Sequence, residues 1–292
     1  MTQNNITEQS FWENIYSNDL SSKSPIPALQ AQKKSSLVKF LFKKIVGSKN
    51  LEKMDNYSNY ILWNRIYPYY LKNFQNKKIV EIGSAPGKHL VKIHQKFGLV
   101  PYGIEYTQSG AEINRSFFEL HGIPSKNVIQ ENFFSEKIEK EYKEYFDVVI
   151  SRGFIEHFTN PKELVERHVH LLKAGGLLIV SIPNLVGFNA FFMKFFNPAL
   201  IKIHNLEIMK RKNFQKIFDI PQIEPLFSGY YGTFNPTLCI PDLKSWTYPI
   251  YRFVEKINPL INFSLRLLFQ DQGKEKKFFS PYLIFIGKKR EA

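Results

Sequence analysis

Residues 79–93, IVEIGSAPGKHLVKI, change within a few positions from an apolar run to a glycine-containing turn and then to helical spacing. Gly83 and Gly87 flank Ala85, and Pro86 stiffens the entry into the following helix. Small residues at such a turn let a ligand approach backbone N–H groups and the positive end of a helix. In an open parallel sheet this turn lies at the edge where ligands bind. The stretch therefore predicts a nucleotide-like ligand at the bend.

Short runs rich in β-branched residues alternate with helical segments on both sides of this motif. The runs lie at 78–83, 99–106, 127–133, 146–153 and 175–183. This alternation predicts a parallel sheet with crossover helices on both faces, and 281–288 is expected to form a terminal strand.

The segment TNPKELVERHVHLLKAGG shows helix start and stop signals. Asn160 can cap the helix, Pro161 fits its first position and Glu163 completes a capping box. Gly175 and Gly176 are expected to end it.

The composition bears on the cellular compartment of the protein and on its possible binding partners. The 292 residues carry a net charge of +14, which fits nucleic acid, an anionic membrane surface or an acidic substrate. The single cysteine, Cys239, excludes an internal disulfide and fits a reducing compartment. We see neither a secretory signal nor an apolar run of roughly 18 residues, so we expect a cytoplasmic protein with no transmembrane segment. Peripheral contact with a membrane stays open.

Three regions lie outside the alternating pattern. Residues 1–76 look helical and are expected to form an N-terminal helical cap, while 77–292 form the main domain. The basic segment 33–46 reads either as a surface helix or as a helix that touches lipid. Aromatic-rich segments at 187–203 and 241–275 are expected to form a substrate-cap insertion.

The chemistry at the bend separates two cofactor classes. A dinucleotide fingerprint needs glycine at its first, third and sixth positions, which here hold Gly83, Ala85 and Lys88. Glu81 ends the first strand beside a small-residue turn and suits a cofactor with a cationic amino-acid portion. Glu105 ends the next strand and can accept hydrogen bonds from both hydroxyls of a ribose.

Over residues 78–218 the sequence resembles the class I S-adenosylmethionine-dependent methyltransferases, through EIGSAPG, FDVVISRGFIEHF and LKAGGLLIVSIPN. The resemblance implies an α/β fold, Rossmann-like and doubly wound, whose mostly parallel sheet has a terminal antiparallel strand and helical caps. It also implies S-adenosyl-L-methionine as cofactor. The methionine portion would meet Glu81 and the backbone of the bend, and Glu105 would bind the ribose. The implied cofactor-binding residues are Glu81, Gly83, Ser84, Ala85, Gly87, Glu105, Asn132, Phe133, Ser151 and Arg152.

Asn132 stands where the family usually has an aspartate that contacts the adenine amino group, and its amide oxygen can accept the same bond. Phe133 could pack on the adenine ring, while Ser151 and Arg152 would line the pocket floor.

The expected reaction is O-methylation of a small-molecule, glycan or lipid-linked acceptor. Deprotonation of a hydroxyl would use a general base, with His157 as first candidate and His204 as second. We predict no metal site. A nucleic-acid (rRNA or tRNA) methyltransferase is less well supported, because SRGF replaces the Asn/Asp-Pro-Pro-aromatic motif after the fourth strand. An NAD-dependent oxidoreductase and a catalytically idle scaffold are the remaining alternatives.

Overall fold

The computed structural model describes residues 5–21, 56–233, 235–239, 241, 244–269 and 275–291. The basic segment 33–46 lies outside the described residues. None of the described helices is long and apolar enough to span a bilayer.

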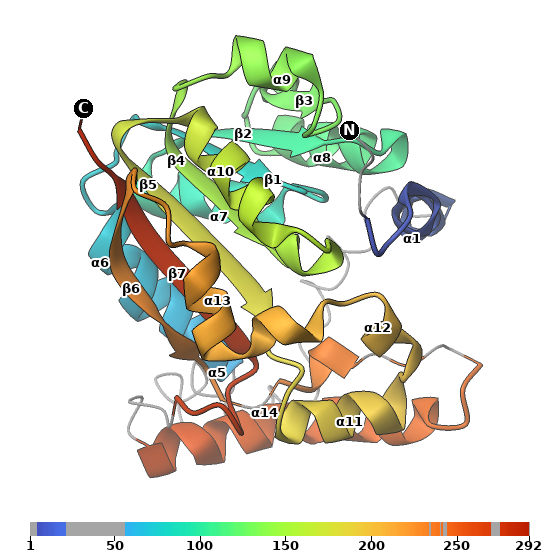
Figure 1. Cartoon of the computed structure of the whole chain (residues 1–292). Coiled ribbons are helices and arrows are strands. Elements are labelled where there is room, and N and C mark those ends of the chain that lie inside the picture. Colours follow the sequence, from blue (N-terminus) through green and yellow to red (C-terminus); the bar gives the residue numbers. More distant parts are fainter. Residues whose placement is uncertain are drawn as a thin grey trace.

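A seven-stranded sheet with the order β3-β2-β1-β4-β5-β7-β6 forms the centre of the molecule (Figure 1). The first five of these pair in parallel, whereas β7 is antiparallel to both β5 and β6. The predicted Rossmann-like α/β fold with a terminal antiparallel strand is confirmed. The strands are β1 Lys78–Ile82, β2 Val100–Glu105, β3 Val128–Gln130, β4 Phe146–Arg152, β5 Leu172–Pro183, β6 Ile223–Tyr231 and β7 Tyr282–Lys289.

Helices cover both faces of the sheet, and alternate residues of the central strands enter two different cores. On β1, Val80 and Ile82 join one buried cluster while Ile79 joins the other. Burial on both faces explains why these strands read as nearly continuous apolar runs. The helices that flank the sheet are α5 Tyr57–Ile61, α6 Tyr67–Leu71, α7 Lys88–Phe97, α8 Gln108–Leu120, α9 Glu136–Glu141, α10 Pro161–Leu171 and α13 Arg211–Ile217.

The predicted end of helix α10 at Gly175 and Gly176 is wrong. The helix ends at Leu171, and β5 begins at the next residue, where Leu172 pairs with Phe146. The register between β4 and β5 then shifts before Val148. A Cβ on Gly176 would lie 2.8 Å from the carbonyl oxygen of Lys173, so this glycine permits the irregular start of a strand instead of capping a helix. Asn160 precedes the helix, but its amide donates to Glu163 and caps no backbone N–H.

An N-terminal helix, α1 Gln9–Ser21, packs against α8. Its Glu13 accepts hydrogen bonds from the backbone N–H groups of Gln108 and Ser109, at 3.1 Å each, and from the Ser109 hydroxyl. These hydrogen bonds lower the pKa of Glu13, and the bond from the Ser109 hydroxyl contributes most. An acidic side chain at the positive end of α8 is favourable and fixes α1 there. Helices α5 and α6 instead share a core cluster with the sheet, and the division at residue 76 stays a prediction.

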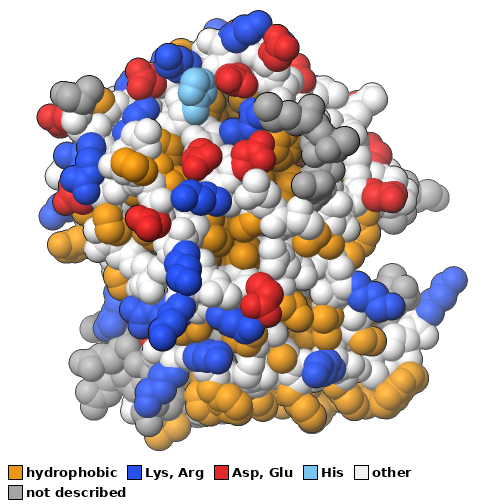
Figure 2. Space-filling view, in the orientation of Figure 1, with side chains coloured by type: hydrophobic (Ala, Val, Ile, Leu, Met, Phe, Trp, Pro, Cys, Tyr) orange, Lys and Arg blue, Asp and Glu red, His pale blue; other side chains and the backbone are white. Residues whose placement is uncertain are grey.

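Two further helices lie side by side at the opposite end of the molecule (Figure 1). They are α11 Phe188–Phe196, which follows β5, and α14 Tyr248–Phe269, with the short α12 Ala199–Lys202 after the first. Phe196 of α11 contacts Tyr251 of α14, with ring centroids 6.0 Å apart. Figure 2 shows hydrophobic side chains gathered along this edge, with Lys and Arg side chains above them.

Candidate active site

Two adjoining cavities open at the carboxyl ends of β1, β2 and β4, with volumes of about 200 and 380 Å³. Glu105, Asn132 and Phe133 line the smaller cavity, whereas Glu81 and His204 line the larger. The cavities therefore form one two-chambered site, whose shared wall is made of Gly83, Ala85, Arg152, Gly153 and His157.

The glycine-containing bend between β1 and α7 forms the wall between the chambers. The N–H groups of Gly83 and Ser84 donate to the Ile104 carbonyl at 3.0 and 3.3 Å, which ties the bend to β2. Gly83 has a φ of +70°, and a Cβ there would lie 3.3 Å from the Phe154 ring. The bend thus offers a ligand backbone surface with little side chain in the way.

At Gly87 both conformation and space require glycine. Its φ is +87°, and a Cβ would lie 2.2 Å from Asn114 Oδ1. We expect Gly87→Ala to lower the free energy of unfolding by about 2 kcal/mol, measured by urea denaturation, since the left-handed conformation alone costs about 1–2 kcal/mol. Gly122→Ala is the matched control, because Gly122 has a φ of +73° and no atom near the added Cβ. Equal losses in the two variants would refute the close approach to Asn114.

Glu105 joins the bend to the end of β2. Its Oε1 accepts from the Thr107 N–H at 3.0 Å and the Thr107 hydroxyl at 2.7 Å, and its Oε2 accepts from the Ala85 N–H at 3.3 Å. The side chain is buried, and this burial raises its pKa despite the bonds that favour the carboxylate. The three donors hold the carboxyl group in one orientation at the wall of the smaller cavity.

Asn132 and Phe133 line the same cavity opposite the bend. Asn132 Oδ1 accepts from the Phe134 N–H at 3.0 Å, which fixes the amide after β3. Phe133 is buried and meets Phe154 edge to face, with ring centroids 5.8 Å apart. A flat apolar ring beside an oriented amide suits the base of a nucleoside.

Residues of the N-terminal segment line the smaller cavity, and the sequence analysis, which expected an N-terminal helical cap, named none of them as site residues. Trp12 and Tyr16 of α1 line it, and the Tyr16 hydroxyl lies 3.5 Å from the Ala85 carbonyl. Asn5 pairs with Phe158 in an isolated antiparallel bridge. The aromatic pair at i and i+4 in FWENIY was the available signal, because this spacing places both rings on one helix face.

Glu81 and His89 line the larger cavity and form a chain of polar contacts with Tyr67. Glu81 lies 3.2 Å from His89 Nδ1, and His89 Nε2 lies 2.9 Å from the Tyr67 hydroxyl. Burial lowers the pKa of His89 to about 4, so the imidazole is neutral beside the Glu81 carboxylate.

Arg152 ends β4 at the junction of the two chambers. Burial alone would lower the pKa of Arg152. The nearby Tyr67 and Glu81 outweigh this effect, so the pKa is raised. Among the described residues, its Nε has no hydrogen-bond partner. A guanidinium with a free donor at this junction can bind an anionic group of a ligand.

Ser151 does not line either cavity as described here, contrary to its expected place on the pocket floor. It is fully buried, and its hydroxyl lies 3.0 Å from Nε2 of the buried His168. This contact with His168 directs the Ser151 hydroxyl into the interior. Ser151 supports β4 from behind the site.

His168 gives the protein a sensitivity to acid. Its Nδ1 donates to the Leu164 carbonyl at 2.6 Å, and burial lowers its pKa to about 4. The unfolded chain takes up a proton near pH 6.5 and the folded chain near pH 4, so the stabilising contribution is lost as the pH falls through this window. We expect His168→Gln to reduce the slope of unfolding free energy against pH, between 6.5 and 4, by about 1.4 kcal/mol per unit. An unchanged slope in urea titrations would contradict the burial of a neutral imidazole.

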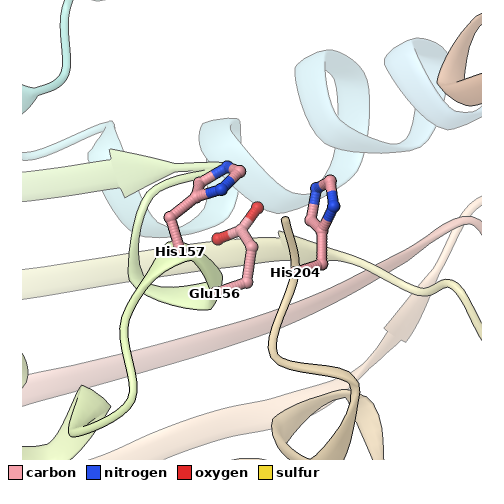
Figure 3. Close-up of side chains that lie close together, drawn as sticks. All are labelled: Glu156, His157 and His204. Atoms are coloured by element: carbon pink, nitrogen blue, oxygen red, sulfur yellow. The ribbon is translucent and has the colours of Figure 1, made fainter. Parts of the chain in front are cut away.

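Three side chains that line the larger cavity lie close together (Figure 3): Glu156, His157 and His204. One donor atom from each lies within 4.8 Å of the others. His157 Nδ1 lies 2.9 Å from the Ile203 carbonyl and 2.9 Å from the Thr7 hydroxyl, and His204 Nδ1 bonds the Leu200 carbonyl. A carbonyl can only accept, so Nδ1 of each ring carries the proton and Nε2 keeps its lone pair.

Burial sets the charge state of this cluster. It lowers the pKa of His157 to about 4, with a further contribution from His204, and it lowers the pKa of His204 as well. Burial raises the pKa of Glu156 to about 8. At neutral pH the cluster therefore consists of two neutral imidazoles and a protonated carboxyl group. Sequence reasoning named both histidines but missed Glu156, although it stands beside His157 in IEHF.

Two imidazoles and a carboxyl group also have the composition of a divalent metal site. The sequence analysis predicted no metal site. In the described part of the chain, this cluster is a group of residues that could hold a metal ion. Both imidazoles are unprotonated at neutral pH, as metal ligands must be, but Glu156 would have to release its proton before it could bind a metal.

Residues 57–275 match the family model described as "Methyltransferase domain". A curated relative, a ubiquinone biosynthesis O-methyltransferase from Shewanella sp. (strain ANA-3), is 25% identical over 108 residues, which are 37% of this chain and 44% of that protein. The chain thus spans less than half the length of this relative.

Solved structures share the fold. Geranyl diphosphate C-methyltransferase from Streptomyces coelicolor A3(2) has a TM-score of 0.51 at 13% identity, over 78% of this chain and 75% of that chain. The MccD protein has a TM-score of 0.51 at 10% identity, over 77% of this chain and 95% of that chain.

Proposed function

The chain belongs to the class I S-adenosylmethionine-dependent methyltransferases, and from this premise we propose that it methylates a hydroxyl oxygen of a small-molecule, glycan or lipid-linked acceptor. Its cofactor is S-adenosyl-L-methionine. The family match decides against the NAD-dependent oxidoreductase.

We assign the nucleoside of the cofactor to the smaller cavity and its methionine portion to the bend. Gly83, with its positive φ, leaves the bend open, and a Cβ there would approach Phe154. Glu105 has its carboxyl group held at the wall for the ribose, and Asn132 and Phe133 suit the base. Arg152 would meet the carboxylate of the methionine portion, and Glu81 its ammonium group. The bound cofactor supplies an electrophilic methyl carbon.

The acceptor would occupy the larger cavity, next to the cluster of Glu156, His157 and His204. The observation that carries this proposal is that His157 lines both chambers while its ring nitrogen Nε2 keeps a free lone pair. An imidazole so placed can take the proton of an acceptor hydroxyl as the oxygen attacks, and its lowered pKa makes it a weaker base than a solvent-exposed imidazole. The curated relative is named as an O-methyltransferase, which supports an oxygen acceptor.

Enclosure of the reacting groups is the second contribution of the chain. Trp12 and Tyr16 cover the smaller chamber, and Trp12 meets the His157 ring edge to face at 5.1 Å. Methyl transfer is an in-line displacement that depends on alignment and on exclusion of water. The α1 segment is therefore proposed as the N-terminal cap of the cofactor site.

The test is transfer of a radiolabelled methyl group to a panel of acceptors. The panel contains catechols, cell-surface glycans, a total bacterial lipid extract, and tRNA with rRNA. Label in a hydroxyl-bearing small molecule, glycan or lipid supports the proposal. Label in RNA alone would overturn it in favour of the nucleic-acid alternative.

A further inference from the structure

An exposed apolar surface runs along α11 and α14, and none of its members lines either cavity. We call it the apolar ridge, and its most prominent members are Phe191, Trp246, Ile250, Phe253, Leu267 and Leu268, with exposed fractions of 41–74%. Side chains of this kind at several adjoining positions are unusual on a surface that faces only water.

Helical spacing places the α14 members together. Ile250, Phe253, Leu260, Leu267 and Leu268 recur at intervals that put them on one side of the helix. The opposite side packs inward through the buried Tyr251 and Asn262. The ridge is thus the outward, apolar side of a helix whose other side is buried.

Helix α11 continues the same surface. Phe195 contacts the exposed Trp246 at a centroid distance of 5.6 Å, and Phe191 beside it is 67% exposed. Figure 2 shows the hydrophobic side chains as a band along this edge of the molecule, below a group of Lys and Arg side chains.

Positive charge predominates on the same elements. Residues 186–202, 244–269 and 275–279 hold two acidic residues, Glu255 and Glu275, and Glu255 is paired with Arg252. Positive charge beside the ridge complements an anionic surface. The same ranges contain seven exposed basic residues, Lys194, Lys202, Lys244, Arg252, Lys256, Lys276 and Lys277, and one buried one, Arg266.

We propose that the apolar ridge docks the enzyme onto an anionic phospholipid membrane, with α14 lying in the plane of the interface. Aromatic and aliphatic side chains would enter the boundary between headgroups and acyl chains, while the lysines meet lipid phosphates. Among the described helices none can cross the bilayer, so the contact is peripheral.

The docking surface lies close to the acceptor chamber. Leu238 lines the larger cavity, and its short helix Pro236–Cys239 packs against both α11 and α14. Docking by the ridge would therefore bring the acceptor chamber near the membrane surface. The inference on docking itself does not depend on which acceptor is methylated.

The test is cosedimentation of the full chain with phosphatidylcholine vesicles and with vesicles that also contain phosphatidylglycerol. We expect binding to the anionic vesicles, weakened by salt. The double variant Phe253→Ser/Leu268→Ser should bind at least about tenfold more weakly. Its matched control is Leu120→Ser/Leu226→Ser, which removes exposed leucines elsewhere and should bind as the wild type does.

A second pair of variants tests the charge. Lys194→Glu/Lys256→Glu should lose about tenfold or more in binding, since each cation near an anionic surface contributes about 1 kcal/mol, whereas Lys96→Glu/Lys126→Glu should lose less. Absence of vesicle binding, or wild-type binding by the ridge variant, would overturn the proposal. So would a dimer, seen by sedimentation velocity, that dissociates when Phe253 is replaced, because the ridge would then belong to a second copy.

Discussion

His157→Gln is expected to lower the turnover number by about 10²- to 10⁴-fold, the usual contribution of a general base. Glutamine can keep the hydrogen bond to the Ile203 carbonyl, but its side chain has no basic nitrogen. The affinity for S-adenosylhomocysteine should change little, since the proposed ribose and adenine contacts are made by other residues.

The measurement is methyl transfer to the best acceptor of the panel at saturating cofactor, with S-adenosylhomocysteine affinity measured by calorimetry. His170→Gln is the control, because His170 is a partly exposed histidine of α10 that lines neither cavity and whose Nε2 bonds the Glu139 carbonyl. A turnover number that falls less than threefold in His157→Gln would remove the base assignment. If His204→Gln then shows the large loss, the second candidate takes the role.

Glu105→Ala is expected to weaken S-adenosylhomocysteine binding by about 10- to 150-fold, which corresponds to about 1.5–3 kcal/mol for hydrogen bonds to a charged group. The carboxyl group is already oriented by Thr107 and Ala85, so a ribose would meet it without further ordering. Titration calorimetry measures the change.

Glu105 also bonds its own chain, so a structural loss must be separated from a lost ligand contact. Thr107→Val removes one donor to the same carboxyl group and leaves that group in place, and it should weaken binding much less. Both variants should keep a cooperative thermal transition. Wild-type affinity in folded Glu105→Ala would show that the ribose lies elsewhere.

The parts of the site that the sequence predicted are local in the chain. The bend from Glu81 to Gly87 and the strand end at Glu105 follow from glycine spacing and from strands of regular length, because these are properties of a few consecutive residues. Parallel strand order then places both at one edge of the sheet.

The parts of the site that the sequence analysis missed depend on contacts between segments that are distant in the chain. Thr7 meets His157, and Glu156 meets His204, only after the chain has folded. Strand β6 carries Pro225 and Gly229 and a register shift against β7, so its sequence lacks a regular strand pattern. The contact of Ser151 with His168 likewise joins two separate elements, β4 and α10, and no local pattern predicts it.

A crystal structure of the complex with S-adenosylhomocysteine tests the two-chambered site most directly. The account predicts the adenosine in the smaller cavity, with the ribose hydroxyls within hydrogen-bond distance of Glu105 and the sulfur at the junction beside Arg152 and Gly153. The sulfur would then face His157. A ligand whose adenosine fills the larger cavity, or whose sulfur points away from His157 and His204, would contradict it.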